Sequence, residues 1–407
     1  MNKRKIFNDP VYGFTSIPYG ILFDLVEHPY FQRLRRIKQV SLTHYVYPGA
    51  LHTRFHHALG ALHLMGEAIE VLRSKDVDIS AEEAEAVSIA ILLHDIGHGP
   101  FSHTLEHTLI NVHHEELSLR FMERLNEIFG GKLALAIRIF KDEYPKKFLH
   151  QLVSGQLDMD RMDYLNRDSY FTGVSEGVIG FDRIIKMLAV HDGELAVEEK
   201  GIYSIEKFLI ARRLMYWQVY LHKTVLAAEQ MLIKTLQRAK QLAMRGEQLD
   251  VPKSLAFFLY QDISLEDFDA KLPEMLGHFA RLDDYDIFSA LKGFADHPDP
   301  LLAYLADSII GRRIFRIELK NLPFEPSYLE EVKKQVEQRF EGFPEGYLDY
   351  LVMSGNQTNH AYNTAKDEIK ILYKDGSVLP ISQVMDFGLQ TNVSRKFYLC
   401  YPKSSAV

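Results

Sequence analysis

The sequence predicts a mainly α fold, a multi-helical body followed by a small α/β region at its C-terminal end. Apolar residues recur at intervals of three and four through most of the first three hundred positions, where alternating strand patterns are scarce. After Gly311 the pattern changes to short alternating runs separated by turn residues. We therefore expect a helical domain over residues 1–311 and a small α/β C-terminal region over residues 312–407.

Two helices of this body carry histidines on their apolar faces. Residues 55–73 form one helix, and the spacing of its apolar residues puts His57 on the inward-facing stripe. A capping box that starts at Ser80 begins the second helix, which ends at a run of glycines and a proline. His94 and Asp95 are thus expected near the C-terminal end of that helix.

Two further predicted helices carry polar residues on one face. Residues 156–168 form one of them and place Asp160, Arg167 and Asp168 on the same side. Residues 204–245 predict a single helix of roughly 60 Å, long enough to reach a neighbouring subunit. Its polar stripe consists of Arg212, Tyr216, Tyr220 and Lys223. The stripe either lines a site or forms a surface of salt bridges and aromatic rings, and the sequence leaves both interpretations open.

The C-terminal region alternates between strand and helix patterns. Residues 313–320 alternate like a strand, and residues 328–340 have helical spacing. The dipeptide Asp375-Gly376 is typical of a hairpin turn between two short strands. Residues 397–401 would supply the last strand of the region.

The composition limits the kind of ligand and the compartment. The chain has 407 residues and a formal net charge of -8 at pH 7, which argues against general attraction to nucleic acid or anionic lipid. Its apolar runs are far shorter than a membrane span, and a turn follows the basic start where a secretory signal would need an apolar run. We expect a cytoplasmic protein without membrane or nucleic-acid partners. Cys400 is the only cysteine, so a metal site would use histidines and carboxylates.

Histidines are concentrated in one segment. Twelve of the 18 histidines lie between His28 and His114, where an even spread would place about four. A single histidine on an apolar face is usually a hydrogen-bonded core residue. A dozen of them, interleaved with acidic residues, favour a metal site or an acid-base site.

The best candidates for metal ligands are two imidazoles and two carboxylates. His94 and Asp95 come from one turn at a glycine-broken helix end, where burial is costly unless both groups find partners. His57 adds an imidazole from another helix, and Asp160 adds a carboxylate from a third. Such nitrogen and oxygen ligands suit one divalent Fe, Mn, Zn, Ni, Co or, less well, Mg ion. The alternative is a network of buried hydrogen bonds without a metal.

Other side chains suit acid-base and phosphate chemistry. The remaining histidines of the segment are more than one metal can use, and a histidine with a near-neutral pKa can donate a proton to a departing oxygen. These are His98, His103 and His114, with Glu115 beside the last. The candidates for phosphate contacts are Arg54, Arg161, Tyr164, Arg212 and Lys223. Each of the charged ones is also compatible with an ordinary surface ion pair.

Several separated motifs give the chain a resemblance to a known family. They are Arg54–His57, His94–His103, His114–Glu115 and Asp158–Tyr164, together with Asn8–Gly13, Phe31–Arg35 and Tyr45–Ala50. In this order they resemble the HD-domain phosphohydrolases and, more narrowly, the dGTPase-like deoxynucleoside triphosphate (dNTP) triphosphohydrolases. The resemblance covers roughly residues 4–245, and its motifs are specific because they occur in order, whereas an isolated His-Asp dipeptide would mean little.

The resemblance implies a role for each matching residue. The metal would be held by His57, His94, Asp95 and Asp160, with further Mg accompanying the nucleotide. The catalytic histidines would be His98, His103 and His114, with His103 protonating the leaving 5′ oxygen. Arg54, Arg161, Tyr164 and Arg212 would bind the triphosphate, Gln39 and Asp168 the sugar 3′-hydroxyl, and Tyr220 would pack on the sugar and disfavour a 2′-hydroxyl. The implied reaction is attack of water on the α-phosphorus, which releases a deoxynucleoside and inorganic triphosphate.

The resemblance also implies nucleotide activation and assembly into homo-dimers or tetramers. The family's activator site matches Lys5, Asn8, Gln32 and Arg35, but Glu27 stands where an aspartate helps to recognise guanine. Activation by dGTP is therefore left open. Leu221 stands where a eukaryotic member has a glutamine near the base, so the preferred base is open as well.

Two other functions are compatible with these residues. An HD-type metal site could serve a phosphodiesterase, or a phosphohydrolase that acts on a cyclic nucleotide or an alarmone. Tyr220 and Asp168 distinguish these possibilities, because a sugar-recognising pair has little use in a general phosphodiesterase. A nucleotide sensor without turnover is the third possibility, and the complete set of metal ligands argues against it.

Overall fold

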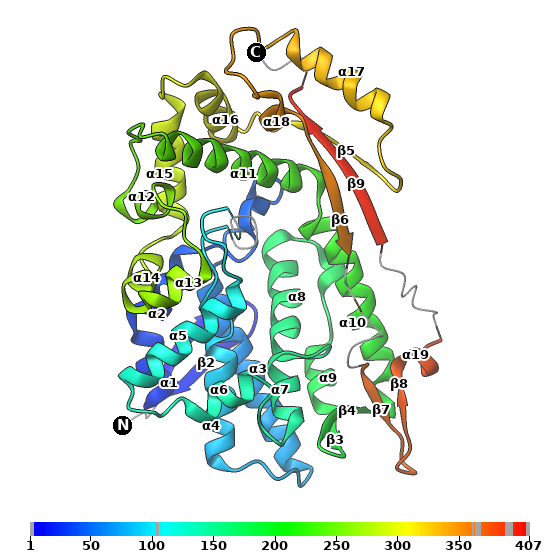
Figure 1. The fold of residues 1–407 in the computed structure, drawn as a ribbon. Helices are drawn as coiled ribbons and strands as arrows, with labels where there is room; N and C mark the ends of the chain where they lie inside the picture. Colours follow the sequence, from blue (N-terminus) through cyan, green and yellow to red (C-terminus); the bar gives the residue numbers. More distant parts are fainter. Residues whose placement is uncertain are drawn as a thin grey trace.

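The mainly helical fold that the sequence predicts is confirmed by a computed structural model of the chain (Figure 1). The structure describes residues 4–101, 106, 108–359, 362, 368–386 and 394–403. Within these residues, helices make up most of the body and the strands form small sheets. None of the described helices is long and apolar enough to span a membrane.

Three helices at the centre of the body carry most of the candidate site. Helix α3 (Arg54–Ser74) packs against α4 (Ala81–Leu93) on one side and α8 (Met159–Thr172) on another. Around them lie α1 (Ile21–Glu27), α2 (Pro29–Gln32), η1 (Arg33–Arg36), η2 (Ser41–Tyr45), α5 (His114–Ile128), α6 (Ala134–Phe140), α7 (Lys147–Val153), η4 (Ser175–Gly177), α9 (Phe181–Lys186) and η5 (Glu199–Gly201). The body is completed by α10 (Ile202–Met215), η6 (Tyr216–Tyr220), α11 (Lys223–Met244), α12 (Lys253–Leu259), α13 (Leu265–Ala270), α14 (Leu272–Phe279), α15 (Asp284–Ala295) and α16 (Pro300–Ile310).

The starts of α4 and α8 follow from their capping residues. The predicted capping box of α4 is confirmed, because the Ser80 hydroxyl accepts from the Glu83 amide at 3.1 Å and the Glu83 carboxylate accepts from the Ser80 amide at 2.8 Å. Helix α8 begins later than predicted, because the Asp158 carboxylate caps it by accepting from the Arg161 amide at 2.7 Å. This cap places Asp160 in the first turn of α8.

The strands of the described residues form three small sheets. Strands β1 (Arg4–Asp9) and β2 (Gly13–Pro18) make an antiparallel hairpin that the sequence did not predict. A second sheet has the order β3 (Leu188–His191), β4 (Glu194–Glu198), β7 (Lys370–Leu372) and β8 (Val378–Pro380). The third has the order β5 (Arg316–Lys320), β9 (Ser394–Tyr401) and β6 (Met353–Asn359).

The C-terminal strands are joined to the helical body (Figure 1). Strand β7 pairs in parallel with β4 from inside the body, and the predicted hairpin around Asp375-Gly376 is confirmed by the antiparallel pair β7 and β8. Helices α17 (Pro326–Glu337), α18 (Leu348–Leu351) and α19 (Ile381–Val384) complete the region. The division into domains at residue 311 stays a prediction, although one sheet spans both sides of it.

The predicted single helix over residues 204–245 is wrong. Helix α10 passes into a π-helical turn at Tyr216–Tyr220, and α11 starts afresh at Lys223 with the His222 imidazole accepting from the Thr224 amide at 3.2 Å. The periodic apolar pattern continues across this break, which is why the spacing alone did not indicate it. In Figure 1, α11 crosses the upper part of the molecule in a different direction from α10.

Gly60 allows α3 and α8 to approach closely. A Cβ atom built at Gly60 would lie 2.0 Å from a carboxylate oxygen of Asp163 and 2.1 Å from the guanidinium of Arg167, both on α8. Gly66 lies in the same helix and has no heavy atom within 4 Å of such a Cβ. The two glycines thus share a helix but differ in what a methyl group would meet.

We expect opposite effects on stability from alanine at these two positions. Gly60→Ala should lower the free energy of unfolding by about 1–3 kcal/mol, because the new methyl group overlaps two buried charged groups. Gly66→Ala should raise it by up to about 1 kcal/mol, because alanine favours the helix. Denaturant unfolding followed by circular dichroism measures both, and a Gly60→Ala protein as stable as Gly66→Ala would contradict the close approach.

Candidate active site

Three of the four predicted metal ligands meet at one point. His57 comes from α3, His94 ends α4 and Asp160 lies in the first turn of α8. The Oδ1 atom of Asp160 is 3.1 Å from Nε2 of His57 and 3.5 Å from Nε2 of His94, and the two Nε2 atoms are 3.4 Å apart. All three ligand atoms lie within 4.8 Å of one another, so they can surround a single ion.

Asp95 joins this group from the same turn as His94. Its Oδ1 is 3.4 Å from Nε2 of His94, and its Oδ2 is 3.7 Å from Nε2 of His57. The guanidinium of Arg54 forms an ion pair with Oδ2 of Asp95. Burial alone would raise the pKa of Asp95, but the neighbouring His94 and Arg54 hold that pKa well below its usual value. Asp95 is therefore an ionised carboxylate at neutral pH.

The far side of each imidazole fixes its tautomer. The Nδ1 of His94 lies 2.7 Å from the carbonyl oxygen of Ile91, and the Nδ1 of His57 lies 2.7 Å from Oδ2 of Asp163. A carbonyl or carboxylate oxygen only accepts, so each Nδ1 donates its proton and each Nε2 can direct a lone pair to the centre. Two imidazole nitrogens and two carboxylates in this arrangement fit a divalent metal ion of the Fe, Mn, Zn, Ni or Co kind.

Asp160 and Asp163 make the His57 imidazole hold its proton strongly. Burial alone would lower the pKa of His57, but its hydrogen bonds with Asp160 and Asp163 raise that pKa to about 10. A cation that binds Nε2 of His57 must displace this proton. Metal binding at this site therefore releases protons and weakens as the pH falls.

A chain of buried charges continues from His57 to the N-terminal hairpin. Asp163 lies between His57 and Arg167, whose guanidinium donates to both Asp163 oxygens at 2.9 Å. Arg167 also lies 2.9 Å from the carboxylate of Asp9 in β1. The side chains of His57, Asp163 and Arg167 have no exposed surface. Positive and negative groups alternate along this series, so each buried charge has an opposite charge beside it.

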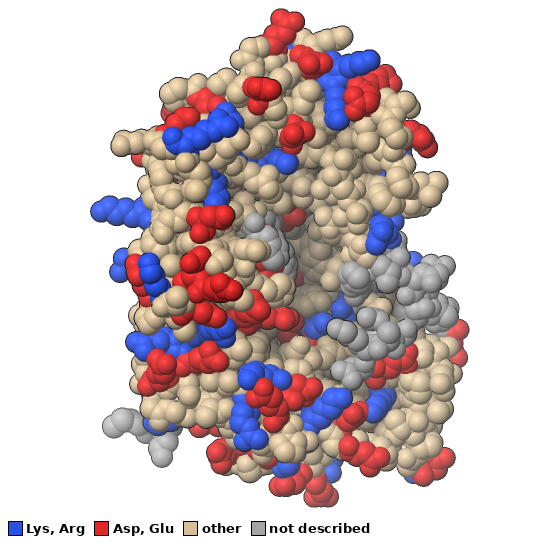
Figure 2. Space-filling view, in the orientation of Figure 1, with Lys and Arg blue, Asp and Glu red and all other residues tan. Residues whose placement is uncertain are grey.

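Most of the other predicted site residues line one cavity beside these ligands. The cavity has a volume of about 830 Å³, and a hollow is visible in the middle of the face in Figure 2. The predicted residues that line it are Gln39, Arg54, Asp95, His98, His114, Asp160, Arg161, Tyr164, Asp168, Arg212, Tyr216, Tyr220 and Leu221. Lys223 is exposed and does not line the cavity, so the predicted polar stripe of residues 212–223 divides between the cavity and the surface.

The arginines of the cavity lie near the metal ligands. Arg161 forms an ion pair with Asp158 and lies 3.9 Å from Oδ2 of Asp160. The guanidinium of Arg212 donates to the amide oxygen of Gln156 at 3.2 Å. Burial raises the pKa of Tyr164, so its hydroxyl stays protonated and can donate to a ligand.

Asp168 is the centre of a second cluster of polar side chains in the cavity, separate from the metal ligands. Its Oδ1 is 2.6 Å from Nε2 of His52, and its Oδ2 accepts from the Tyr220 hydroxyl at 2.8 Å. The His52 ring stacks on Phe171 with their centroids 4.5 Å apart. Gln39 lies beside this group, since its backbone amide donates to the backbone carbonyl of His52 at 3.0 Å. Each carboxylate oxygen of Asp168 retains a lone pair for a hydroxyl of a ligand.

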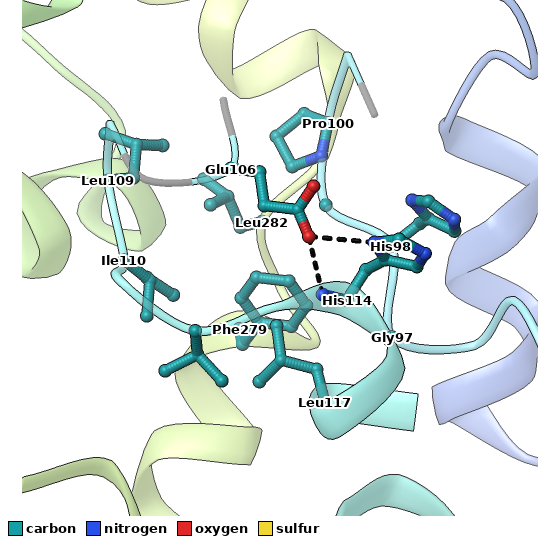
Figure 3. Close-up of a pocket in the computed structure, with 12 residues that line it drawn as sticks. Gly97, His98, Pro100, Glu106, Leu109, Ile110, His114, Leu117, Phe279 and Leu282 are labelled. Atoms are coloured by element: carbon teal, nitrogen blue, oxygen red, sulfur yellow. Dashed lines mark hydrogen bonds and ion pairs between the residues drawn. The ribbon is translucent and has the colours of Figure 1, made fainter. Parts of the chain in front are cut away.

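The remaining histidines of the prediction flank the metal ligands. The His98 and His114 rings stack with centroids 4.1 Å apart, and Nε2 of His98 is 3.3 Å from Asp95. Figure 3 shows Glu106 over His114, which it meets at Nδ1 (2.8 Å) and at the backbone amide (2.6 Å). Burial and the charge of Arg54 lower the pKa of His98 well below its usual value. His98 is therefore neutral, and it can accept or donate a hydrogen bond.

Two of the predicted catalytic residues do not lie in the described part of this group. His103 is outside the described residues. Glu115 is exposed and does not line the cavity, and the carboxylate that contacts His114 is Glu106. Glu115 follows His114 directly, but α5 starts at His114 and turns the next side chain outward.

The predicted activator residues lie at the N-terminal hairpin and the helices that follow it. Lys5 and Asn8 are exposed on opposite faces of β1, and Glu27 is exposed at the end of α1. Arg35 donates to the Gln32 side chain at 2.8 Å and lies over the Phe55 ring at 3.5 Å. None of these residues lines the cavity.

Comparison with known families identifies the class of protein. Residues 54–168 match the HD domain, and residues 179–251 match the HD associated region. The chain is 31% identical to the uncharacterized protein YwfO of Bacillus subtilis over 78% of this chain and 72% of that protein. A crystal structure of a phosphohydrolase from Bacteroides thetaiotaomicron has 54% identity and a TM-score of 0.95, covering 98% of this chain and 100% of the other. The chain belongs to the HD-domain phosphohydrolase family, and it is a hydrolase of that kind.

Two further relatives are named for an activity. The chain is 32% identical to the deoxynucleoside triphosphate triphosphohydrolase SAMHD1 homolog of Dictyostelium discoideum, over 61% of this chain and 52% of that protein. It is 30% identical to SAMHD1 of Gallus gallus, over 58% of this chain and 45% of that protein. These matches cover about half of the SAMHD1 chains.

The sequence analysis gave no role to several residues of the site, although it placed Arg167 on the same face of its helix as Asp160. Asp163, Arg167 and His52 support the ligands or Asp168, and Glu106 orients His114. Asp163 follows Asp160 by three positions and therefore shares its face of α8, which is a signal that could have indicated it. Glu106 lies in a loop, where spacing carries no such signal.

Removing the charge of Asp163 should weaken metal binding. Asp163→Asn keeps the shape but lowers the basicity of His57, and its amide group can reverse the imidazole tautomer, so we expect metal affinity to fall about 10- to 100-fold. Titration calorimetry with Mn²⁺ measures the affinity, and elemental analysis measures retained metal. Glu67→Gln is the matched control, because Glu67 is also a carboxylate beside a histidine. It contacts His63 at 3.3 Å on the outer part of α3, the helix that carries His57. Equal metal affinity in the two variants would argue against a role for Asp163.

Proposed function

We propose that this protein hydrolyses dNTPs to deoxynucleosides and inorganic triphosphate. The observation that carries the proposal is the cluster of Asp168, His52 and Tyr220 in the same cavity as the metal ligands and the arginines. A nucleotide has a charged triphosphate, a sugar with one free hydroxyl and a planar base, and this cavity offers a matching polar group for the first two. The SAMHD1 relatives support the same substrate class.

The arginines would hold the triphosphate against the metal ligands. Guanidinium groups contact phosphate oxygens in a planar fork and neutralise their charge. Arg212 is buried and Arg161 is partly buried, so their interaction with an anion is screened less than at an open surface. His57, His94, Asp95 and Asp160 would hold a divalent ion, which would supply a Lewis acid for the phosphoryl group and for water.

The sugar would be read by Asp168 and Tyr220. The carboxylate of Asp168 accepts from a 3′-hydroxyl, while His52 and Tyr220 fix its orientation. The Tyr220 ring lies 6.0 Å from the Tyr164 ring and 5.5 Å from the Tyr216 ring, which limits its movement. A held ring beside the sugar leaves little room for a 2′-hydroxyl, so deoxyribose is favoured.

The histidines would manage protons at the scissile bond. The reaction forms a bond between the water oxygen and the α-phosphorus and breaks the bond from that phosphorus to the 5′ oxygen, which needs a proton. We assign this proton to His103, as the family resemblance implies. Glu106 orients His114, and the neutral His98 stacks against the His114 ring. The two histidines would therefore bind the phosphate or the water.

The proposal also includes activation by a nucleotide and assembly into an oligomer. We infer an activator site at Lys5, Asn8, Glu27, Gln32 and Arg35, and a homo-oligomer. The family resemblance supports both. A lag or a rate difference between single dNTPs and a dNTP mixture would reveal activation, and light scattering would give the oligomeric state.

Product analysis tests the proposed reaction. Protein loaded with Mn²⁺, Fe²⁺, Co²⁺ or Mg²⁺ is incubated with the four dNTPs, singly and mixed, and the products are separated by chromatography. We expect deoxynucleosides and triphosphate in equal amounts, and their loss by at least about 100-fold in His94→Ala and Asp95→Ala, because the ligand set is then incomplete. His63→Ala is the control, since His63 lies on the outer side of α3. Intact dNTPs under every metal would contradict the proposal and favour another phosphoester substrate.

Sugar discrimination can be tested separately at Tyr220. Tyr220→Ala removes the ring that would exclude a 2′-hydroxyl, so the ratio of kcat/KM for a dNTP over the corresponding ribonucleotide should fall about tenfold or more. Tyr170→Ala is the matched control, because Tyr170 is an exposed tyrosine of α8. A ratio that stays the same in the Tyr220 variant would mean that another group reads the sugar.

A further inference from the structure

One end of the cavity is built differently from the end that holds the metal ligands. Its wall is a single face of α11, formed by Leu226, Glu229, Gln230 and Ile233, whose spacing of three and four puts them in line. The described lysines and arginines that line the cavity are Arg54, Arg161 and Arg212. Arg54 is paired with Asp95 and Arg161 lies near Asp160, so these two charges belong to the metal end. Arg212 comes from α10, on the opposite side of the π-helical turn from α11, and donates to Gln156.

This composition disfavours phosphate at the α11 end. Leu221, Leu226 and Ile233 offer apolar surface there, which does not replace the hydration of a polyanion. A flat, neutral ring with polar edges suits such a wall, because its faces contact apolar side chains and its edges need hydrogen bonds. If the triphosphate and the sugar lie as proposed above, the nucleobase is the part of the substrate that reaches this wall.

The C-terminal region completes the wall and positions one of its residues. Strand β6 contributes Gln357 and Thr358 to the cavity. The Tyr398 hydroxyl from β9 donates to Oε1 of Gln230 at 3.0 Å, which leaves the two amide hydrogens on Nε2 of Gln230 for another partner. Gly355 of β6 pairs with Tyr398, and a Cβ at Gly355 would lie 2.7 Å from the Tyr398 hydroxyl. The glycine thus leaves room for the tyrosine that orients Gln230.

Gln357 lies on the same face of the sheet as Tyr398. Gln357 pairs with Lys396 across the antiparallel strands, two positions along from the pair of Gly355 and Tyr398, and side chains two apart on a strand share a face. The Lys396 ammonium lies over the Trp217 ring at 4.0 Å, which packs this part of the sheet against the π-helical turn η6. Gln357 is therefore held on the side of the sheet that faces the cavity.

We propose that Gln230 and Gln357 read the edge of the nucleobase, so that the C-terminal region sets the base preference of the enzyme. A carboxamide such as that of Gln357 offers a donor and an acceptor side by side, which is the pattern that discriminates bases by bidentate contacts. Gln230, whose oxygen accepts from Tyr398, adds a donor. The proposal rests on the proposed function, because it takes the base as the part of a dNTP at this wall. Gln230 lies within the HD associated region, whereas Gln357 lies beyond both family matches, the second of which ends at residue 251.

The test measures binding, so that it stays separate from catalysis. The dissociation constant of each of the four dNTPs is measured by calorimetry with metal-free, full-length protein, in which hydrolysis is suppressed. We expect the wild type to bind the four dNTPs with different affinities, and the ratio of best to worst to fall about tenfold in Gln357→Leu and in Gln230→Leu. Gln357→Glu, which replaces a donor by an acceptor, should change which base binds best. Tyr398→Phe should reduce the ratio in the same direction as Gln230→Leu.

The controls separate a general loss from a loss of selectivity. Gln335→Leu changes an exposed glutamine of α17 in the same region and should leave all four constants unchanged. Circular dichroism and the thermal midpoint identify a variant that fails to fold, in which case Gln357→Glu carries the test. Equal or absent binding of the four dNTPs by the wild type, or equal weakening of all four in the variants, would overturn the base-reading proposal. Selective binding without release of triphosphate from the metal-loaded enzyme would overturn the proposed reaction alone.

Discussion

The site depends first on how charge is buried around His57. Its imidazole has no exposed surface, and Asp160 and Asp163 approach it from the same helix. Removing a charged group from water costs roughly several kcal/mol per ion, unless opposite charges and hydrogen bonds compensate for the lost solvation. Here the compensation extends outward through Arg167 to Asp9 in the first strand. The N-terminal hairpin, α3 and α8 are therefore held together by one balanced set of charges, and this set also fixes the imidazole that faces the centre.

The end of α4 is completed by groups from distant segments. The buried Arg33 donates to the carbonyls of Ile96 and His98 at 2.9 and 2.8 Å, so backbone acceptors just beyond the helix are satisfied without water. Gly97 donates to the Ser118 hydroxyl at 2.9 Å, and a Cβ on Gly97 would lie 2.2 Å from the Ser118 amide. These contacts bring α5, which begins with His114, directly against the turn that carries His94 and Asp95. The metal ligands and the acid-base histidines thus share one support.

The sequence was informative where periodicity or a cap determines a side chain's position. The helix expected over residues 55–73 is observed as Arg54–Ser74, and the inward stripe placed His57 correctly in the interior. The roles that the family resemblance assigns to the site residues stay predictions, although most of those residues lie around one cavity. Contacts between segments far apart in the chain were not predictable in this way. Glu106 contacts His114 from a loop. Asp9 contacts Arg167 from the N-terminal hairpin, whose strands are too short and too close to turn residues for the sequence pattern to indicate them.

The π-helical turn at Tyr216–Tyr220 shows why a continuous pattern can still conceal a functional break. A straight helix over residues 204–245 would carry Arg212, Tyr216, Tyr220 and Lys223 along one line. The wider turn, followed by a new start at Lys223, instead leaves Lys223 at the surface and brings the Tyr220 hydroxyl within 2.8 Å of Asp168. Such turns insert a residue into the helical pattern and occur often at functional sites. Because the chain changes direction there, α10 and α11 can form two different walls of the same cavity, one with Arg212 and the other with Gln230.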